Sequence, residues 1–119
     1  MILSEEKEIF NAIAQSIVSS ELDDKWDYAL LKMMVIADTV EFNLHFYYNE
    51  NAKNTKLNGA FKCSLEVLKL YKLTHEHPNY KKWNRSTFRL YANSKMQIDY
   101  IWDEELQKEV DEYNKENQS

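Results

Sequence analysis

The chain has 119 residues, a formal net charge of −5 and one glycine, where average usage would give about eight. This length fits one domain, which we expect to span residues 1–119. The scarcity of glycine excludes the glycine-rich phosphate loops of P-loop and dinucleotide-binding proteins. A single cysteine, Cys63, excludes an internal disulfide, and the start Ser4–Lys7 is unlike a signal peptide. We therefore expect a cytoplasmic protein with no membrane segment.

Charged residues are distributed unevenly along the chain. Residues 1–50 and 96–119 are acidic, whereas residues 51–95 carry ten basic and only two acidic side chains. The simplest interpretation is that these segments pair with one another in the fold and that their charges are solvated. The alternative is that one sign gathers on a face and attracts a partner of opposite charge.

The first expected element is a helix over residues 5–21. Ile9, Ile13 and Ile17 recur at four-residue intervals and form one apolar stripe. Ser4 suits the N-cap position, and acidic residues follow it in the first turn, where they complement the helix dipole.

Two strands and a weaker third follow this helix. Residues 26–36 are apolar at both alternating sets of positions, which is typical of a strand covered on both faces. After a turn at residues 38–39, residues 40–48 alternate between apolar and polar side chains, as in a strand with one buried face. Residues 49–55 are polar and without periodicity, so we expect a loop there. A short third strand is expected over residues 57–62.

The second half of the chain predicts a helix and then a hairpin. Ser64 can cap the helix, which must end before Pro78 because the residue preceding proline avoids helical geometry. Residues 87–91 and 96–102 alternate like two strands joined by a short turn.

A last helix is expected to begin near Asp103 and to fray over residues 113–119. The element order is therefore α-β-β-β-α-β-β-α. This order predicts an α+β fold in which helices pack on an antiparallel sheet of about five strands.

No residue pattern demands catalysis. His75 and His77 are two positions apart and cannot share a helix face, so a metal site is not expected. Cys63 lies beside apolar residues and is expected to be a buried, inert side chain. No pair of carboxylates has a spacing that requires acid–base chemistry. We expect no enzyme activity, no cofactor and no metal.

The outer face of the sheet is the strongest candidate for binding a partner. Period-two alternation places six polar or aromatic side chains on it: Glu41, His45, Tyr47, Arg89, Tyr91 and Asp99. Tyrosine is favoured in protein interfaces, so Tyr47 and Tyr91 are the expected anchors. Asp103 and Glu104 are expected to add negative charge at the end of the sheet. The alternatives are an ordinary solvated face or a face that a helix covers.

The segment that includes Tyr80, Lys81, Lys82, Trp83 and Arg85 mixes aromatic and basic side chains, as nucleic-acid-binding surfaces do. The sequence pI of about 5.2 argues against this interpretation, and Trp83 is expected instead to anchor its loop to the core. A small regulatory protein that binds nucleic acid through residues 51–95 is the alternative function.

Five features of the sequence resemble the YezG-like immunity proteins. They are the opening helix at residues 9–17, Trp26 at the start of a strand, the aromatic strand end Phe46-Tyr47-Tyr48, the later Trp83 and the closing run at residues 96–100. The resemblance extends to the wider class of bacterial immunity proteins, including those of contact-dependent growth inhibition. It implies a cytoplasmic antitoxin that neutralises a cognate toxin, often a nuclease, by stoichiometric protein–protein binding. It also implies neither catalysis nor direct nucleic-acid binding by this chain.

Overall fold

The computed structural model describes residues 4–23 and 25–116. Within these ranges it contains three helices and a five-stranded antiparallel sheet, in the predicted order α-β-β-β-α-β-β-α. The elements are α1 (Ser4–Ser19), β1 (Tyr28–Ile36), β2 (Thr39–Tyr48), β3 (Asn51–Thr55), α2 (Ala60–Glu76), β4 (Arg85–Tyr91), β5 (Met96–Ile101) and α3 (Glu104–Glu116). The α+β fold class expected from the sequence is confirmed.

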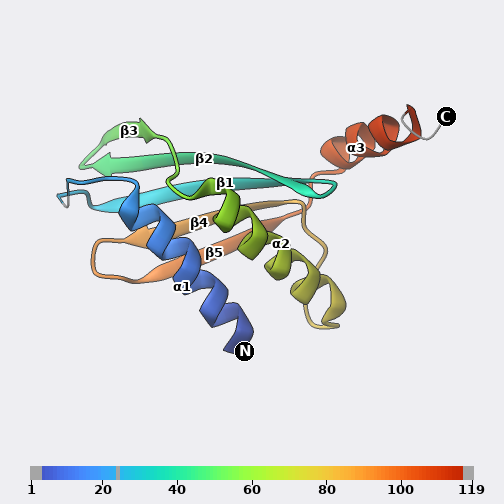
Figure 1. Cartoon of the computed structure of the whole chain (residues 1–119), viewed down its shortest axis with the longest axis horizontal. Coiled ribbons are helices and arrows are strands. Elements are labelled where there is room, and N and C mark those ends of the chain that lie inside the picture. The colour runs from blue at the N-terminus through green and yellow to red at the C-terminus, as the bar shows by residue number, and fades with distance from the viewer. Residues whose placement is uncertain (1–3, 24, 117–119) are drawn as a thin grey trace.

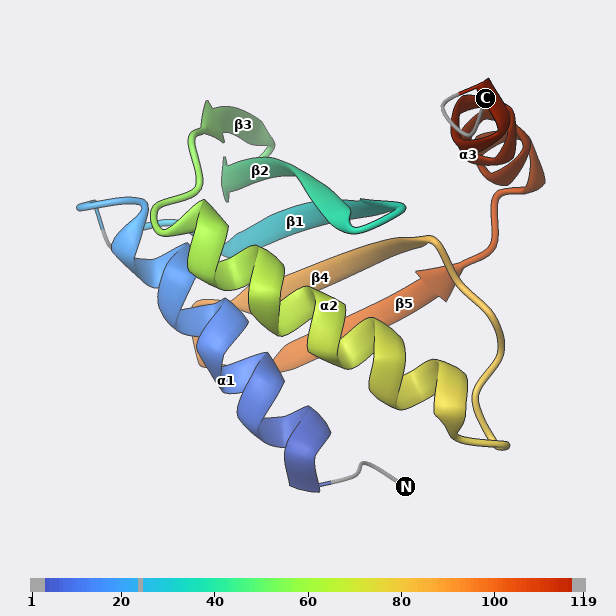
Figure 2. The ribbon, with the colours of Figure 1, turned by 45° about the vertical axis from the view of Figure 1, so that its right-hand side comes forward.

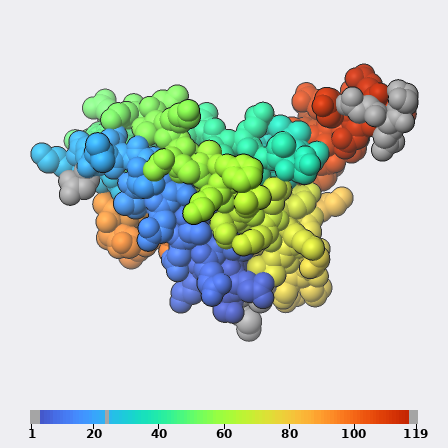
Figure 3. Space-filling model, viewed as in Figure 1, coloured from blue at the N-terminus to red at the C-terminus, as the bar shows by residue number. Residues whose placement is uncertain are grey.

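The sheet has the strand order β3-β2-β1-β4-β5, so β1 is its central strand. Helices α1 and α2 lie beside each other across one face of the sheet (Figure 1, Figure 2). We call this the inner face and the opposite one the outer face. Helix α3 follows β5 and projects beyond the end of the sheet, as the space-filling view shows (Figure 3). No helix of the described residues is long and apolar enough to cross a membrane.

The core lies between the two helices and the inner face of the sheet. The inner side chains of β1 are at most 5% exposed: Ala29, Leu31, Met33 and Val35. The predicted stripe of α1 packs into the same cluster, and Ile13 and Ile17 are completely buried there. The side chains at alternate positions of β1 and those at four-residue intervals of α1 therefore pack together in one apolar layer.

Helical cover on both faces of β1, expected from its apolar sequence, is wrong. On the outer face Lys32 is exposed and Tyr28 and Met34 are half-buried, while Leu30 alone is shielded. The neighbouring strands supply this shielding, because His45 of β2 and Arg89 of β4 are the register partners of Leu30.

The connection from β2 to α2 also differs from its prediction. Residues 51–55, expected to be a loop, form β3, which pairs antiparallel with β2. Residues 57–62 form no strand: Leu57 enters the core, and Gly59 has a φ of 68° at the start of α2. Ser64 lies inside that helix and donates a hydrogen bond to the Phe61 carbonyl, so it is not the cap. An edge strand bonds mainly through its backbone, which is why β3 needs no apolar period.

The end of helix α2 and the loop after it agree with the prediction, whereas the end of α3 does not. Helix α2 ends at Glu76, before Pro78, as expected. Trp83 is completely buried, and its Nε1 donates a hydrogen bond to Thr74 Oγ1 at 2.7 Å, which confirms its role as a loop anchor. Fraying from residue 113 is wrong for residues 113–116, which continue α3, and residues 117–119 lie outside the described residues.

One carboxylate is buried within this fold. Glu6 of α1 is 2% exposed and accepts hydrogen bonds from the hydroxyl groups of Tyr80 and Tyr100, the latter at 3.0 Å. Burial, reinforced by this carboxylate, raises the pKa of Tyr80 to about 12 and raises the pKa of Tyr100 still further. The three side chains thus join the start of α1 to β5 and to the loop after α2.

Replacing Ile13 with alanine should lower the free energy of unfolding by about 2–5 kcal/mol, because the side chain is completely buried and its removal leaves a cavity. Urea denaturation monitored by circular dichroism measures the change. The control is Leu65→Ala on the exposed face of α2, which should change stability by less than about 0.5 kcal/mol. A loss at Ile13 no greater than that of the control would contradict the described core.

Stability should also fall as pH rises above about 10, the pKa of tyrosine in an unfolded chain. The unfolded chain then releases the protons of Tyr80 and Tyr100, whereas the folded chain retains the proton of Tyr80 up to about pH 12. The double variant Tyr80→Phe/Tyr100→Phe should show a shallower decline in alkaline urea titrations. Tyr113→Phe on exposed α3 is the control, and equal slopes in the two variants would be evidence against the buried cluster.

Candidate functional site

Three tyrosines meet on the outer face at one end of the three central strands. The strand register sets Tyr47 of β2 and Tyr91 of β4 directly opposite Tyr28 of β1, one on each side. The rings of Tyr28 and Tyr47 are stacked, with centroids 4.5 Å apart and planes 11° apart. The Tyr91 ring lies 6.1 Å from that of Tyr28. We call these three residues, with Arg89 and His45, the tyrosine patch.

Arg89 places a positive charge within the tyrosine patch. Its guanidinium lies 5.3 Å from the centre of the Tyr28 ring, in a cation–π arrangement. A side-chain hydrogen bond with Tyr91 raises the pKa of Arg89, so the group remains charged. Its Nε is buried and has no hydrogen-bond partner among the described residues.

The structure brings four of the predicted binding residues together and separates the others. His45, Tyr47, Arg89 and Tyr91 belong to the tyrosine patch. Glu41 faces the same way and is exposed, but it lies six residues from Tyr47 along β2, or about 20 Å at the rise of a strand. Asp99 is exposed on β5, where Thr87 is its register partner.

Sequence reasoning missed Tyr28, the residue at the centre of the patch. The first strand is apolar at both sets of positions, so its sequence does not reveal which set faces the helices. The available signal was the register itself, because pairing the Tyr47 end of one strand with the start of its neighbour brings the aromatic side chains together.

Asp103 and Glu104, expected to contribute charge at the end of the sheet, differ in their surroundings. Asp103 Oδ1 accepts a hydrogen bond from the Leu106 amide at 3.1 Å, and Oδ2 accepts one from Arg85 Nε at 2.8 Å. The amide hydrogen bond, with Arg85, lowers the pKa of Asp103. Asp103 therefore stabilises the start of α3, whereas Glu104 is exposed in the first turn of that helix.

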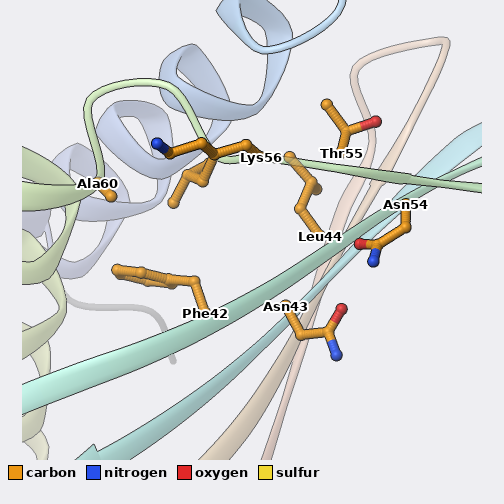
Figure 4. Close-up of a pocket in the computed structure, with 8 residues that line it drawn as sticks. Phe42, Asn43, Leu44, Asn54, Thr55, Lys56 and Ala60 are labelled. Carbon is orange, nitrogen blue, oxygen red and sulfur yellow. The ribbon is translucent and has the colours of Figure 1, made fainter.

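An open hollow of about 550 Å³, separate from the tyrosine patch, lies between β2, the segment after β3 and the start of α2 (Figure 4). The ring of Phe42 and the Ala60 methyl face each other across it, and Lys56 extends along its rim. Thr55 Oγ1 also lines it and has no hydrogen-bond partner among the described residues. The lining offers amides, a hydroxyl and an ammonium group, but no carboxylate, imidazole or thiol.

Cys63 and His75, two of the residues considered for catalysis or metal binding, make contacts within the fold. Cys63 is 1% exposed, as expected, and burial raises the pKa of its thiol to about 11. His75 stacks on Tyr71, and its Nδ1 lies 2.7 Å from the Tyr71 carbonyl oxygen. Across residues 4–23 and 25–116, no group of three His, Cys, Asp or Glu side chains could hold a metal ion.

The basic side chains of residues 51–95 do not lie on one element. They are spread over β3, the segment after it, α2, the loop that follows α2, β4 and the β4–β5 turn. Three of them form ion pairs with acidic groups: Lys53 with Glu21, Lys69 with Glu66, and Arg85 with Asp103. The pairs of Lys53 and Arg85 join this segment to the acidic ones, as the interpretation of paired segments expects, whereas Lys69 and Glu66 are neighbours within α2.

Comparison with models of known protein families finds no match to this chain, and no curated protein matches it. The geometry of the residues themselves is therefore the basis for a functional proposal.

The Cys63 thiol should not react with a disulfide reagent such as DTNB near neutral pH while the protein is folded. Its raised pKa keeps the thiolate scarce, and its burial blocks the reagent. The reaction should become complete in concentrated guanidinium chloride. Leu65→Cys, which adds an exposed thiol on the same helix, provides the positive control. Rapid labelling of the folded parent protein would contradict the described position of Cys63.

Proposed function

We propose that this chain is an immunity protein that binds and neutralises a cognate bacterial toxin in the cytoplasm, with a nuclease as the expected toxin class. The observation that carries the proposal is the tyrosine patch, which occupies a face of the sheet that neither α1 nor α2 covers. Inhibition by stoichiometric binding requires no catalysis, cofactor or metal from this chain.

The composition of the patch supports a protein as the partner. Tyrosine and arginine are enriched among the residues that dominate binding energies in protein interfaces. Here the Tyr28 and Tyr47 rings already stack on each other, and Arg89 lies over Tyr28. Side chains held in this way lose little conformational freedom when a partner covers them.

The net negative charge of the chain favours a partner with a basic surface. The chain carries −5, and many of its acidic residues belong to α1 and α3. A nuclease has a basic surface for its substrate, so an acidic inhibitor would approach it faster than a neutral one would. Binding nucleic acid through residues 51–95 is the competing proposal. The spread of those basic side chains over several elements gives it less support.

The proposal predicts a gene for the toxin next to the gene for this chain, and it is tested with a catalytically inactive form of that toxin's nuclease domain. Tyr47→Ala and Tyr91→Ala should each weaken binding by about 2 kcal/mol or more, or roughly thirtyfold, because each removes an anchor. Isothermal titration calorimetry measures the affinity, after circular dichroism has confirmed that each variant is folded. The same variants should protect cells less well from the active toxin.

Phe61→Ala is the matched control, since Phe61 is 77% exposed on α2, on the opposite side of the sheet. It should bind within about 0.5 kcal/mol of the parent protein. Equal affinity of all three variants would remove the tyrosine patch as the binding site. Absence of toxin binding, together with retention of the parent protein on a DNA column at low salt, would instead support the nucleic-acid alternative.

A further inference from the structure

Strand β2 has a stretch of backbone that only one described strand flanks. Strand β3 pairs with residues 44–48 of β2 and stops at Thr55, so residues 39–43 have β1 on one side and no strand on the other. We call residues 39–43 the free edge of β2. Figure 3 shows its surface, in teal, at the rim of the molecule between β3 and α3. An exposed strand edge of this kind is a template for a further strand.

The hydrogen bonds of β1 show which backbone groups of the free edge are available. The Val35 amide donates to the Asn84 carbonyl at 2.8 Å, so the odd-numbered residues of β1 direct their N–H and C=O groups toward β4. The even-numbered residues of β1 therefore bond to β2, where their register partners are odd-numbered. The N–H and C=O groups of Val40 and Phe42 consequently point away from β1. Within residues 4–23 and 25–116 these groups have no hydrogen-bond partner.

The hollow of Figure 4 lies directly beside the free edge, at the point where β3 ends. Its lining includes Phe42, which is half-buried and packs against the core on the inner face. The Ala60 methyl group faces the Phe42 ring across the hollow. Because the chain turns away after Thr55 toward α2, the position next to Phe42 in the plane of the sheet is open. An added strand therefore has space there for its backbone and for a side chain on the inner face.

Charge along the free edge changes from negative to positive. Asp38 and Glu41 are exposed at its start. At its other end Lys56 extends along the rim of the hollow, whose lining includes no carboxylate. Lys56 forms no ion pair within the part of the chain that the structure describes. A strand that runs parallel to β2 and ends in a carboxylate at the hollow matches this order of charges. An antiparallel strand would instead direct its amino end toward Lys56.

We infer that the free edge of β2 binds the C-terminal end of another polypeptide as an added parallel strand, with the terminal carboxylate in the hollow beside Lys56. In a parallel pair, one residue bonds to two residues of the neighbouring strand that are two positions apart. The third residue from the end thus donates to the Val40 carbonyl and accepts from the Phe42 amide. The last residue donates to the Phe42 carbonyl. The strand must end there, because Thr55 is already the register partner of Leu44.

The pairing also determines which side chains the bound end should carry. The third residue from the end lies opposite Glu41 on the outer face, so a basic side chain suits it. The next-to-last residue lies opposite Phe42 and points toward the hollow, so an apolar side chain suits it. A second copy of this chain suits the free edge less well. Antiparallel pairing about Glu41 would set two glutamates opposite each other, and like charges in that position are destabilising.

An amide NMR titration tests the inference, which does not depend on the proposed function. The probe is acetyl-Thr-Val-Lys-Leu-Thr with a free carboxylate, beside the same peptide with a C-terminal amide. The free acid should shift the signals of Val40, Phe42 and Ala60 and should bind about tenfold more tightly than the amide, because the amide cannot pair with Lys56. The net charge of −5 alone would favour the amide, which is the more positive peptide. The expected order therefore opposes general electrostatic attraction.

Two matched comparisons decide whether the strand pairing and Lys56 produce the effect. Methylating the nitrogen of the last residue should abolish binding, since that N–H donates to Phe42. Methylating the leucine nitrogen, which points away from β2, should change the affinity by less than about twofold. Lys56→Gln should remove the preference for the free acid. Lys81→Gln, which removes the same charge from the loop after α2, should leave that preference unchanged.

Three outcomes would overturn the inference. Equal affinity of the free acid and the amide would indicate that the edge pairs with an internal strand instead. Shifts of Val40 and Phe42 that appear when the protein concentration alone rises would indicate a second copy. The third outcome is the absence of any shift at these residues with the free acid at about 5 mM, where even weak association registers.

Discussion

The packing of α1 and α2 against the inner face of β1 determines which surfaces the molecule can offer to others. Ala29, Leu31 and Met33 are almost completely buried beneath those helices. Burial of this apolar layer is the main stabilising contribution to the fold. Because both helices lie on one face, period-two alternation turns the remaining side chains of β1 outward, where neighbouring strands alone flank them. The tyrosine patch is a consequence of this asymmetric arrangement.

Much of the fold could be predicted from hydrophobic periodicity. The stripe of α1 and the alternation of β2 each identify an element and its buried face, because burial imposes one period on a helix and another on a strand. The polar edge strand β3 could not be predicted, since it is held by backbone pairing with β2 and leaves no apolar pattern. The start of α2 was misplaced for a related reason. Gly59, with its φ of 68°, suits the turn into the helix, whereas the Ser64 hydroxyl donates a hydrogen bond to the Phe61 carbonyl within the helix.

The sequence predicted which face of the sheet carries the candidate site, but not every residue that forms it. Alternation placed Tyr47, Tyr91 and Arg89 on one face from sequence alone, since each follows an apolar residue that must be buried. Tyr28 was not predicted, because its position in the patch depends on how β1 pairs with β2 and with β4, which is distant in sequence. Asp103 illustrates the opposite case. Its sequence position is compatible with a free surface charge, but Arg85 and the Leu106 amide occupy its carboxylate.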